Sequence, residues 1–120
     1  MFKRIDTVFL PVKNISSAIE WYKEKCSFRL RWYHEEGGYA AMDIGDGKTA
    51  FTLVRSDQMG GQKPSMHEWF NLYTADAKAA HEQLALAGVE VTDILNDDTI
   101  EFFNFKDLDG NMIGVCSFKE

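Results

Sequence analysis

The chain has 120 residues, of which 45% are hydrophobic and 27% are charged, and its formal net charge at pH 7 is −6. This length suits a single domain, and this balance is ordinary for a folded protein in water. The acidic charge disfavours nucleic acid, whose phosphates it would repel, and favours neutral or cationic small ligands. With two cysteines, no long apolar run and no signal-peptide order at its start, we expect a reduced, cytoplasmic protein without a membrane segment.

Residues 1–56 predict a first module of four strands and one helix. Residues 3–12 are apolar and β-branched without a helical period, which is typical of a strand. Asn14 and Ser16 are candidate N-caps of a helix whose apolar side chains recur at helical spacing. Three more strands, separated by glycine-containing turns, are predicted at residues 28–35, 39–44 and 49–55. The order is β-α-β-β-β.

After a polar linker at residues 57–64, residues 65–120 predict a second module with the same order. Residues 67–74 are strand-like, and Asp76 can cap a helix that ends at Gly88, a suitable C′ residue. Three further strands are predicted at residues 89–95, 99–105 and 112–118. The repeated order indicates a duplicated supersecondary unit within one domain, residues 1–120.

Three stretches carry a family resemblance: PVKNISSAIEWYKEKCSF, YTADAKAAHEQLALAGVEV and FKDLDGNMIGV. Spaced as they are over essentially the whole chain, they resemble the glyoxalase/bleomycin-resistance/extradiol-dioxygenase group, the vicinal oxygen chelate superfamily. The chain departs from the family at Cys26-Ser27, where Leu-Gly commonly precedes the Phe. The resemblance implies an α+β fold of two βαβββ modules in tandem, with curved mixed sheets around a shared cavity and helices outside. It also implies a homodimer.

The resemblance further implies four strand positions for a divalent metal, which family enzymes fill with His, Glu or Gln. In this chain those positions hold Thr7, Thr52, Trp69 and Gly114. Zinc, nickel, iron and manganese sites use imidazole, thiolate or carboxylate ligands, so this set is unsuited to them and we expect no cofactor. A one-residue register shift toward Asp6 or Glu68 leaves the alternative open: a metal-dependent lyase, isomerase or dioxygenase of the glyoxalase type.

The histidines and cysteines offer weaker alternatives. His34 and His67, with glutamates nearby, could form a site of two histidines and one carboxylate, but isolated histidines are more typical of a surface. Cys116 shares strand parity with Gly114, so it is expected to face the cavity. Because no base or cation beside it would activate the thiol, we interpret it as a small buried side chain and assign no catalytic residue.

Strand parity predicts an aromatic and polar wall inside the cavity. The candidate ligand-binding residues are Thr7, Phe9, Thr52, Trp69, Asn71, Tyr73, Met112, Gly114 and Cys116. Flat rings can stack on a planar or cationic ligand, while Asn71 and the Tyr73 hydroxyl supply direction. Gly114 is expected to leave room where an acid and its ion would stand. The sequence therefore predicts metal-independent sequestration of an aromatic or cationic small molecule, the alternative being that the aromatics only fill a core.

Overall fold

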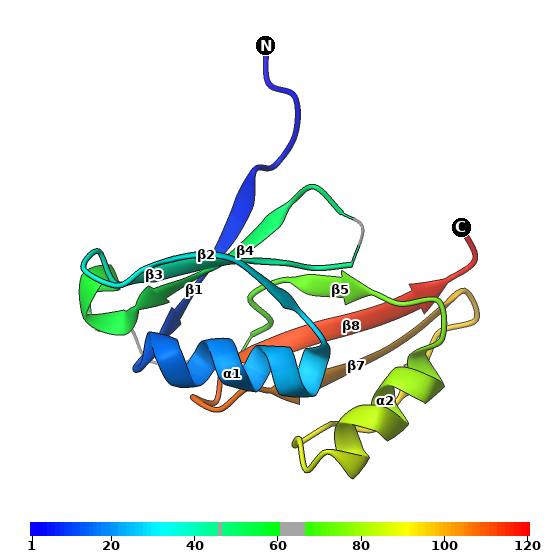
Figure 1. Ribbon diagram of the computed structural model, residues 1–120. Coiled ribbons are helices and arrows are strands. Elements are labelled where there is room, and N and C mark those ends of the chain that lie inside the picture. The colour runs from blue at the N-terminus through cyan, green and yellow to red at the C-terminus, as the bar shows by residue number, and fades with distance from the viewer. Residues whose placement is uncertain (46, 61–66) are drawn as a thin grey trace. The chain divides into compact units, whose positions relative to one another are not determined.

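The computed structural model describes residues 1–45, 47–60 and 67–120. The chain divides into two compact units, Met1–Lys63 and Pro64–Glu120. Within the described residues, each unit holds a four-stranded sheet and one α-helix in the order β-α-β-β-β (Figure 1). The predicted α+β fold of two βαβββ modules in tandem is thereby confirmed. No helix in the described parts of the chain is long and apolar enough to cross a membrane.

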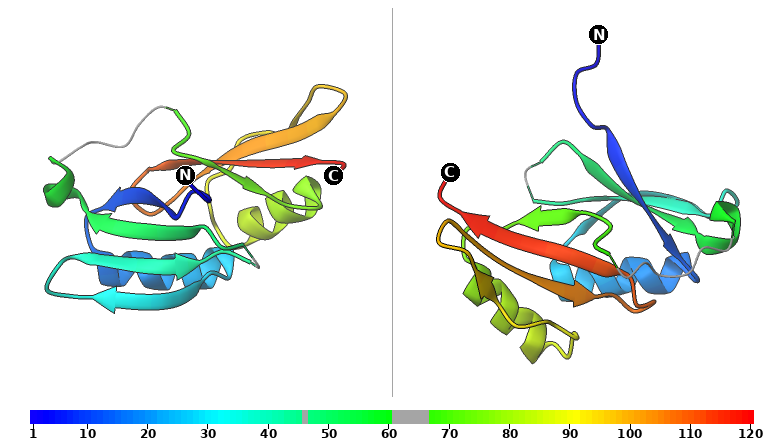
Figure 2. Two further views of the ribbon diagram at one scale, coloured as in Figure 1. Left: turned by 90° about the horizontal axis from the view of Figure 1, so that it is seen from above. Right: turned by 180° about the vertical axis from the view of Figure 1, so that it is seen from behind.

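The sheet of the first unit has the strand order β1-β4-β3-β2. Its elements are β1 (Thr7–Val12), α1 (Ile15–Cys26), β2 (Arg29–His34), β3 (Tyr39–Asp43), β4 (Ala50–Arg55) and the 3₁₀ turn η1 (Ser56–Met59). β1 runs parallel to β4, whereas β3 is antiparallel to both of its neighbours. Figure 2 shows these strands side by side with α1 along one face of the sheet.

The α1 helix packs on this sheet through an apolar stripe. Its buried side chains recur at spacings of three and four: Ile15, Ala18, Ile19 and Tyr22. The ring of Tyr22 lies 4.8 Å from that of Phe51 on β4 and 5.7 Å from that of Phe28, centroid to centroid. Of the two candidate caps, Asn14 is the one used, because its side chain accepts a hydrogen bond from the Ser17 N–H at 2.9 Å.

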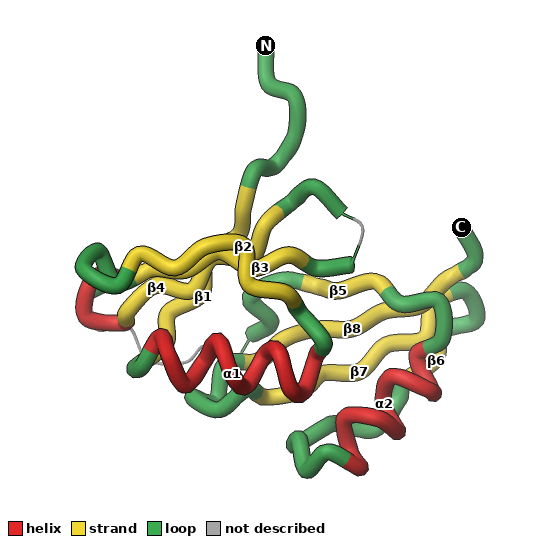
Figure 3. The backbone as a smooth tube through the Cα atoms, in the orientation of Figure 1, coloured by secondary structure: helices red, strands yellow, loops and turns green. Residues whose placement is uncertain are grey.

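The second sheet repeats the arrangement with the strand order β5-β8-β7-β6. Its elements are β5 (Asn71–Tyr73), α2 (Ala77–Leu86), β6 (Leu95–Asn96), β7 (Ile100–Lys106) and β8 (Met112–Phe118). β5 runs parallel to β8, and β7 is antiparallel to β6 and β8. Figure 3 shows the short β6 beyond β7, near α2.

One face of the second sheet forms the core beneath α2. Phe103 and Val115 are buried on this face, and the His81 ring of α2 lies edge-on to Phe103 at 5.0 Å. Asp76 caps the helix by accepting a hydrogen bond from the Ala79 N–H at 3.0 Å, and Gly88 follows its end with φ +84°, a conformation that favours glycine.

The structure shortens three of the predicted strands by four residues or more. β1 begins at Thr7, since the preceding residues are exposed and make no ladder. The strand predicted at 67–74 is reduced to Asn71–Tyr73. Residues 89–94 lie beside β7 but make only one bridge, Val91 to Phe105, before the two-residue β6. The predicted linker lies partly in η1 and partly, at residues 61–64, outside the described residues.

Candidate functional site

The face of the second sheet opposite α2 presents two cross-strand rows of side chains. Asn71, Gly114 and Asn104 lie opposite one another on β5, β8 and β7. Tyr73, Cys116 and Phe102 form the next row toward the end of β8. Because cross-strand partners point to the same face of a sheet, these six residues share one surface. The residues that alternate with them along each strand point to the opposite face, which packs beneath α2.

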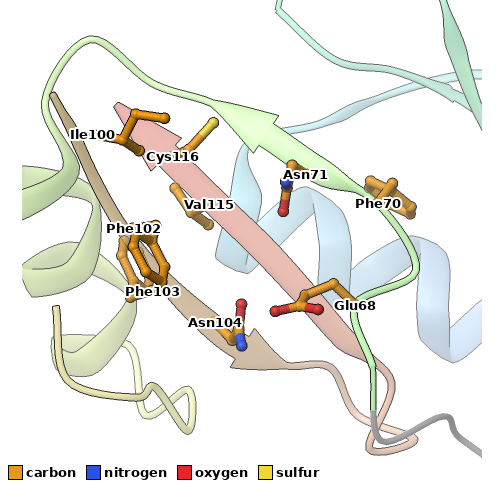
Figure 4. A pocket seen from close by; sticks show the side chains of 9 residues that line it. All are labelled: Glu68, Phe70, Asn71, Ile100, Phe102, Phe103, Asn104, Val115 and Cys116. Carbon is orange, nitrogen blue, oxygen red and sulfur yellow. The ribbon is translucent and has the colours of Figure 1, made fainter. Parts of the chain in front are cut away.

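A groove of about 440 Å³ runs over this face. It is lined by Glu68, Phe70, Asn71, Ile100, Phe102, Phe103, Asn104, Val115 and Cys116 (Figure 4). Of these, Phe103 and Val115 are the two residues that are buried in the core beneath α2 and only border the groove. All nine residues belong to the second unit. The polar members Glu68, Asn71 and Asn104 gather at the Gly114 end of β8, whereas Ile100 and Phe102 lie toward its far end. The groove thus has a polar end and an apolar end.

Glu68 supplies the charge of the polar end. It comes from the segment before β5 and reaches over β8 toward Asn104, as Figure 4 shows. A hydrogen bond from its own backbone N–H and one from the Asn104 side chain lower the pKa of the Glu68 carboxyl below its ordinary value. The carboxyl is therefore ionised at neutral pH and already oriented by two donors.

The side chains of Asn71 and Glu68 lie against Gly114. A Cβ at this position would fall on the Asn71 Oδ1 atom and would lie 3.2 Å from the Glu68 Cγ atom. The space that the sequence predicted beside Gly114 is therefore filled by the Asn71 amide. Gly114 is the partner of Asn71 in the parallel pairing of β5 and β8, and because it has no side chain the amide can lie against the β8 backbone. Among the described residues the Asn71 amide has no hydrogen-bond partner, so its donors and acceptor are available to a ligand.

The other predicted binding residues of the second unit lie around the groove. Cys116 lines it, whereas Trp69, Tyr73 and Met112 do not. The Tyr73 hydroxyl donates a hydrogen bond to the Phe118 carbonyl at 3.0 Å, and its ring packs edge-on against the Phe118 ring. The Met112 sulfur accepts a hydrogen bond from the Asn104 amide at 3.5 Å. Trp69 is half-buried, and its indole Nε1 is buried without a partner among the described residues.

The predicted residues of the first unit lie on the face of its sheet opposite α1. The Thr7 and Thr52 hydroxyl oxygens are 2.7 Å apart. Phe9 lies opposite Thr52, and the same row continues through Ala41 to Trp32 on β2. This row has an exposed aromatic ring at each edge, 54% exposed for Phe9 and 43% for Trp32, with small side chains between them. Sequence reasoning identified Phe9 but missed Trp32.

Sequence reasoning also missed seven of the residues that line the groove. They are Glu68, Phe70, Ile100, Phe102, Phe103, Asn104 and Val115. The motifs of the resemblance pointed to β5 and β8 and left β7 without an assignment. The signal was present in the alternation of residues 100–104, where Ile100, Phe102 and Asn104 share one face.

Fold and site define a tandem βαβββ protein with a ligand-sized groove on one sheet. The sequence model of the Glyoxalase/Bleomycin resistance protein/Dioxygenase superfamily matches residues 4–115. The chain belongs to this superfamily, as its motifs predicted. No curated protein matches it.

Solved structures with the same fold include proteins of several bacteria. TnmS3, an antibiotic binding protein from Streptomyces sp. CB03234, has a TM-score of 0.86 at 23% identity, with 98% of each chain covered. A superfamily member from Sphaerobacter thermophilus DSM 20745 has a TM-score of 0.87 at 18% identity, with 97% of this chain and 98% of that chain covered. TioX from Micromonospora sp. ML1 has a TM-score of 0.75 at 16% identity, with 98% of this chain and 100% of that chain covered. At these identities the likeness concerns the fold.

The residues at the family's metal positions do not fit a transition-metal ion. In the first unit, Thr7 and Thr52 direct their hydroxyl oxygens at each other. In the second unit, the described residues that line the groove include one carboxylate, Glu68, and no imidazole. Within the described parts of the chain, no three His, Cys, Asp or Glu side chains converge. Hydroxyl and amide groups are poor ligands for zinc or iron, so no chemical step is assigned to a metal here.

Proposed function

We propose that this protein binds and sequesters a small apolar or aromatic molecule that carries a polar or cationic group, and that it does so without a metal. The observation that carries the proposal is the division of the groove into a polar and an apolar end. Its volume of about 440 Å³ falls within the range of about 300–1,000 Å³ that is typical of small-molecule sites. A few convergent polar groups beside apolar side chains are usual in such sites.

Each end of the groove has a defined task in binding. Phe102, which is 38% exposed, and Ile100 offer apolar surface that a ligand would remove from water, which stabilises the complex by about 25 cal/mol per Å² buried. The free Asn71 amide and the ionised Glu68 carboxylate fix the ligand's orientation by hydrogen bonds. None of these groups is placed as a nucleophile beside a base, so the arrangement favours binding over chemistry.

The structural relatives support the same function. TnmS3 is an antibiotic binding protein, and it shares the fold over almost the whole of this chain. Binding in the cell would lower the concentration of the free ligand, which is how a protein without catalytic groups protects against a toxic small molecule. The resemblance also leads us to propose a homodimer, to be checked by sedimentation at several protein concentrations.

The test is a binding screen followed by a matched pair of variants. Planar aromatic molecules with and without amino groups are screened by thermal shift, and dissociation constants of the hits are measured by isothermal titration calorimetry. Phe102→Ala is expected to weaken binding about tenfold, because it removes a ring from the groove wall. Leu86→Ala, on the outer side of α2 and 81% exposed, is the control and should bind as the parent protein does. Equal affinity of the Phe102→Ala variant would contradict the proposal.

A further inference from the structure

A second cavity adjoins the apolar end of the groove. This cavity, of about 570 Å³, is lined by Asp98, Thr99, Ile100, Phe118 and Lys119. Ile100 lines both spaces, so they lie next to each other along β7 and β8, and together they offer one path to a long ligand. From Gly114 to Phe118 the path covers four strand steps, which is about 13 Å at about 3.3 Å per residue. The combined site is therefore long rather than round.

The charges along this path are not distributed evenly. At the Gly114 end, Glu68 is the charged residue among those lining the groove. At the far end Asp98 and Lys119 carry opposite charges, and an overlapping cavity that shares both residues adds Glu101. Between them the lining is apolar, with Ile100 and Phe102 on β7 and Phe118 on β8. The Glu68 end thus has a carboxylate and no lysine or arginine among its lining residues, whereas the acidic groups of the far end share it with Lys119.

The Glu68 carboxylate keeps hydrogen-bonding capacity for a ligand. A carboxylate has about four acceptor positions, and the hydrogen bonds from its own backbone N–H and from Asn104 use two of them. The open positions face the groove beside the free Asn71 amide. The aromatic rings of Phe70 and Phe102 line the same space and favour a cation over a neutral donor.

We infer that the site takes an elongated amphipathic molecule in one orientation, with a protonated amine or guanidinium against Glu68 and an apolar body along Ile100 and Phe102 toward Phe118. This inference rests on the proposed function and names the ligand class and its direction. Glu68 is the residue that selects the cation, and Phe118 is the residue that meets the apolar end. An anionic head group at the Glu68 end is rejected by like charge.

The experiment compares three probes that share one body, a naphthalene ring on a butyl chain. They end in a primary amine, a hydroxyl or a carboxylate, and their dissociation constants are measured by calorimetry at pH 7 and low salt. The amine should bind about fivefold more tightly than the alcohol, the upper range for an exposed ion pair, and the carboxylate should bind more weakly than the alcohol. This preference should shrink when salt is added, because salt screens exposed charges.

Two variants and a control test the two ends of the site one at a time. Glu68→Gln should abolish the preference for the amine over the alcohol, since the amide keeps the shape of the side chain and loses its charge. Phe118→Ala should weaken the amine and the alcohol by the same factor. Glu90→Gln is the control, because Glu90 is exposed, pairs with Lys106 and does not line the groove. Thermal melts show that each variant is folded.

The possible results distinguish a failure of this inference from a failure of the proposed binding function. Equal binding of the amine and the alcohol by the parent protein, or an amine preference that survives Glu68→Gln, would overturn the inference and leave the binding function standing. Binding of none of the three probes, together with no hit in the aromatic screen, would overturn both. A fivefold preference lost only in Glu68→Gln supports the assigned orientation.

Discussion

The hydroxyl oxygens of Thr7 and Thr52 lie 2.7 Å apart, one on β1 and the other on β4. The Thr7 hydroxyl also lies 3.0 Å from the Ala50 carbonyl oxygen and 3.3 Å from the Val8 carbonyl oxygen, and it can donate its single proton to either. When Thr7 donates to the backbone, Thr52 donates to Thr7, and the hydroxyls form a chain that ends on a main-chain carbonyl. Because Thr52 is 5% exposed, its hydroxyl depends on this one acceptor.

Removing both members of this chain should cost less than the sum of the costs of removing each one alone. Thr7→Val leaves the Thr52 hydroxyl buried without an acceptor, and should lower the free energy of unfolding by about 1–3 kcal/mol. Thr52→Val leaves Thr7 bonded to Ala50, and should cost about 1 kcal/mol or less. The double variant should lose less than the sum of the two single losses. Urea denaturation of the three variants measures these differences, and strict additivity would show that the hydroxyls do not depend on each other.

A methyl group at Gly114 should disturb the polar end of the groove. Gly114→Ala places a Cβ on the Asn71 amide and close to the Glu68 side chain, so both must move. Ligand affinity should fall about tenfold, in line with the loss of one or two oriented hydrogen bonds. Gly47→Ala is the matched control, because its Cβ would meet only the Ile44 carbonyl oxygen at 3.6 Å, an ordinary contact. Calorimetry with the best hit of the screen gives both affinities.

An unchanged affinity of the Gly114→Ala variant would show that neither Asn71 nor Glu68 orients the ligand. A drop in melting temperature without a change in affinity would assign Gly114 a role in packing alone. Both results would contradict the role given to this end of the groove.

The fold was accessible from the sequence because its local signals are consistent with one another. The strand predicted at 112–118 is β8, with the same bounds, since Gly110 in the preceding turn has the positive φ that its residue type permits. The caps at Asn14 and Asp76 sit where a short polar side chain precedes an apolar helical stripe. These features depend on near neighbours in the chain, which the sequence displays directly.

The site was less accessible because strand parity holds only inside a continuous strand. Counting back from Asp76 to Trp69 enters residues 67–70, which are not strand. They make two backbone hydrogen bonds with β8, from the Trp69 N–H to the Met112 carbonyl and from the Gly114 N–H to the Phe70 carbonyl. Alternation of faces is lost there, and Glu68 rather than Trp69 lies on Gly114. Predicting this would have required knowing where the ladder of β5 stops, which depends on its pairing with β8.

The stability contributed by Glu68 should depend on pH in one direction. Hydrogen bonds to the carboxylate lower its pKa from the ordinary value of 4.5, so the folded state holds the ionised form more strongly than the unfolded state does. The contribution is fully present above pH 4.5 and is lost as the pH falls below that value through the folded pKa. The charge of the neighbouring His67 also lowers the pKa of the Glu68 carboxyl.

The difference in unfolding free energy between the parent protein and Glu68→Gln reports this effect. It should be constant from pH 7 to about pH 5.5 and should shrink below about pH 4.5. Asn104→Ala removes one donor and should shift the decline toward higher pH. A difference that grows as the solution is acidified would show that the carboxyl is destabilised by its surroundings, contrary to the geometry.

Metal should neither accompany the purified protein nor stabilise it. After growth with added zinc, nickel, manganese and iron, elemental analysis should find far less than one equivalent per chain. The melting temperature should not rise with any of the four ions, because a ligand that binds the native state must raise it. Ligand binding should also survive treatment with a chelator. About one bound equivalent together with a raised melting temperature would replace the proposed function by that of a metal enzyme with another ligand set.

The turn between β7 and β8 should be the most sensitive part of the closing hairpin. Asp107 is 6% exposed, and its Oδ1 atom accepts hydrogen bonds at 2.9 Å from the backbone N–H groups of Asp109 and Asn111. Its Oδ2 atom accepts one at 3.0 Å from the Asn111 side chain, which is 1% exposed. The carboxylate thus satisfies three donors in a buried turn, and removing it leaves them without their acceptor.

Asp107→Ala should therefore lower the free energy of unfolding by about 3 kcal/mol, since several buried donors lose a charged acceptor at once. Leu108→Ala, at the exposed next position of the same turn, should change it by about 1 kcal/mol or less. Asp107→Asn should fall between the two, because an amide keeps one acceptor oxygen and introduces donors where donors already converge. Because β8 carries Gly114 and Cys116, a loosened hairpin should also weaken ligand binding, whereas equal stability of all three variants would show that the turn is held by its backbone alone.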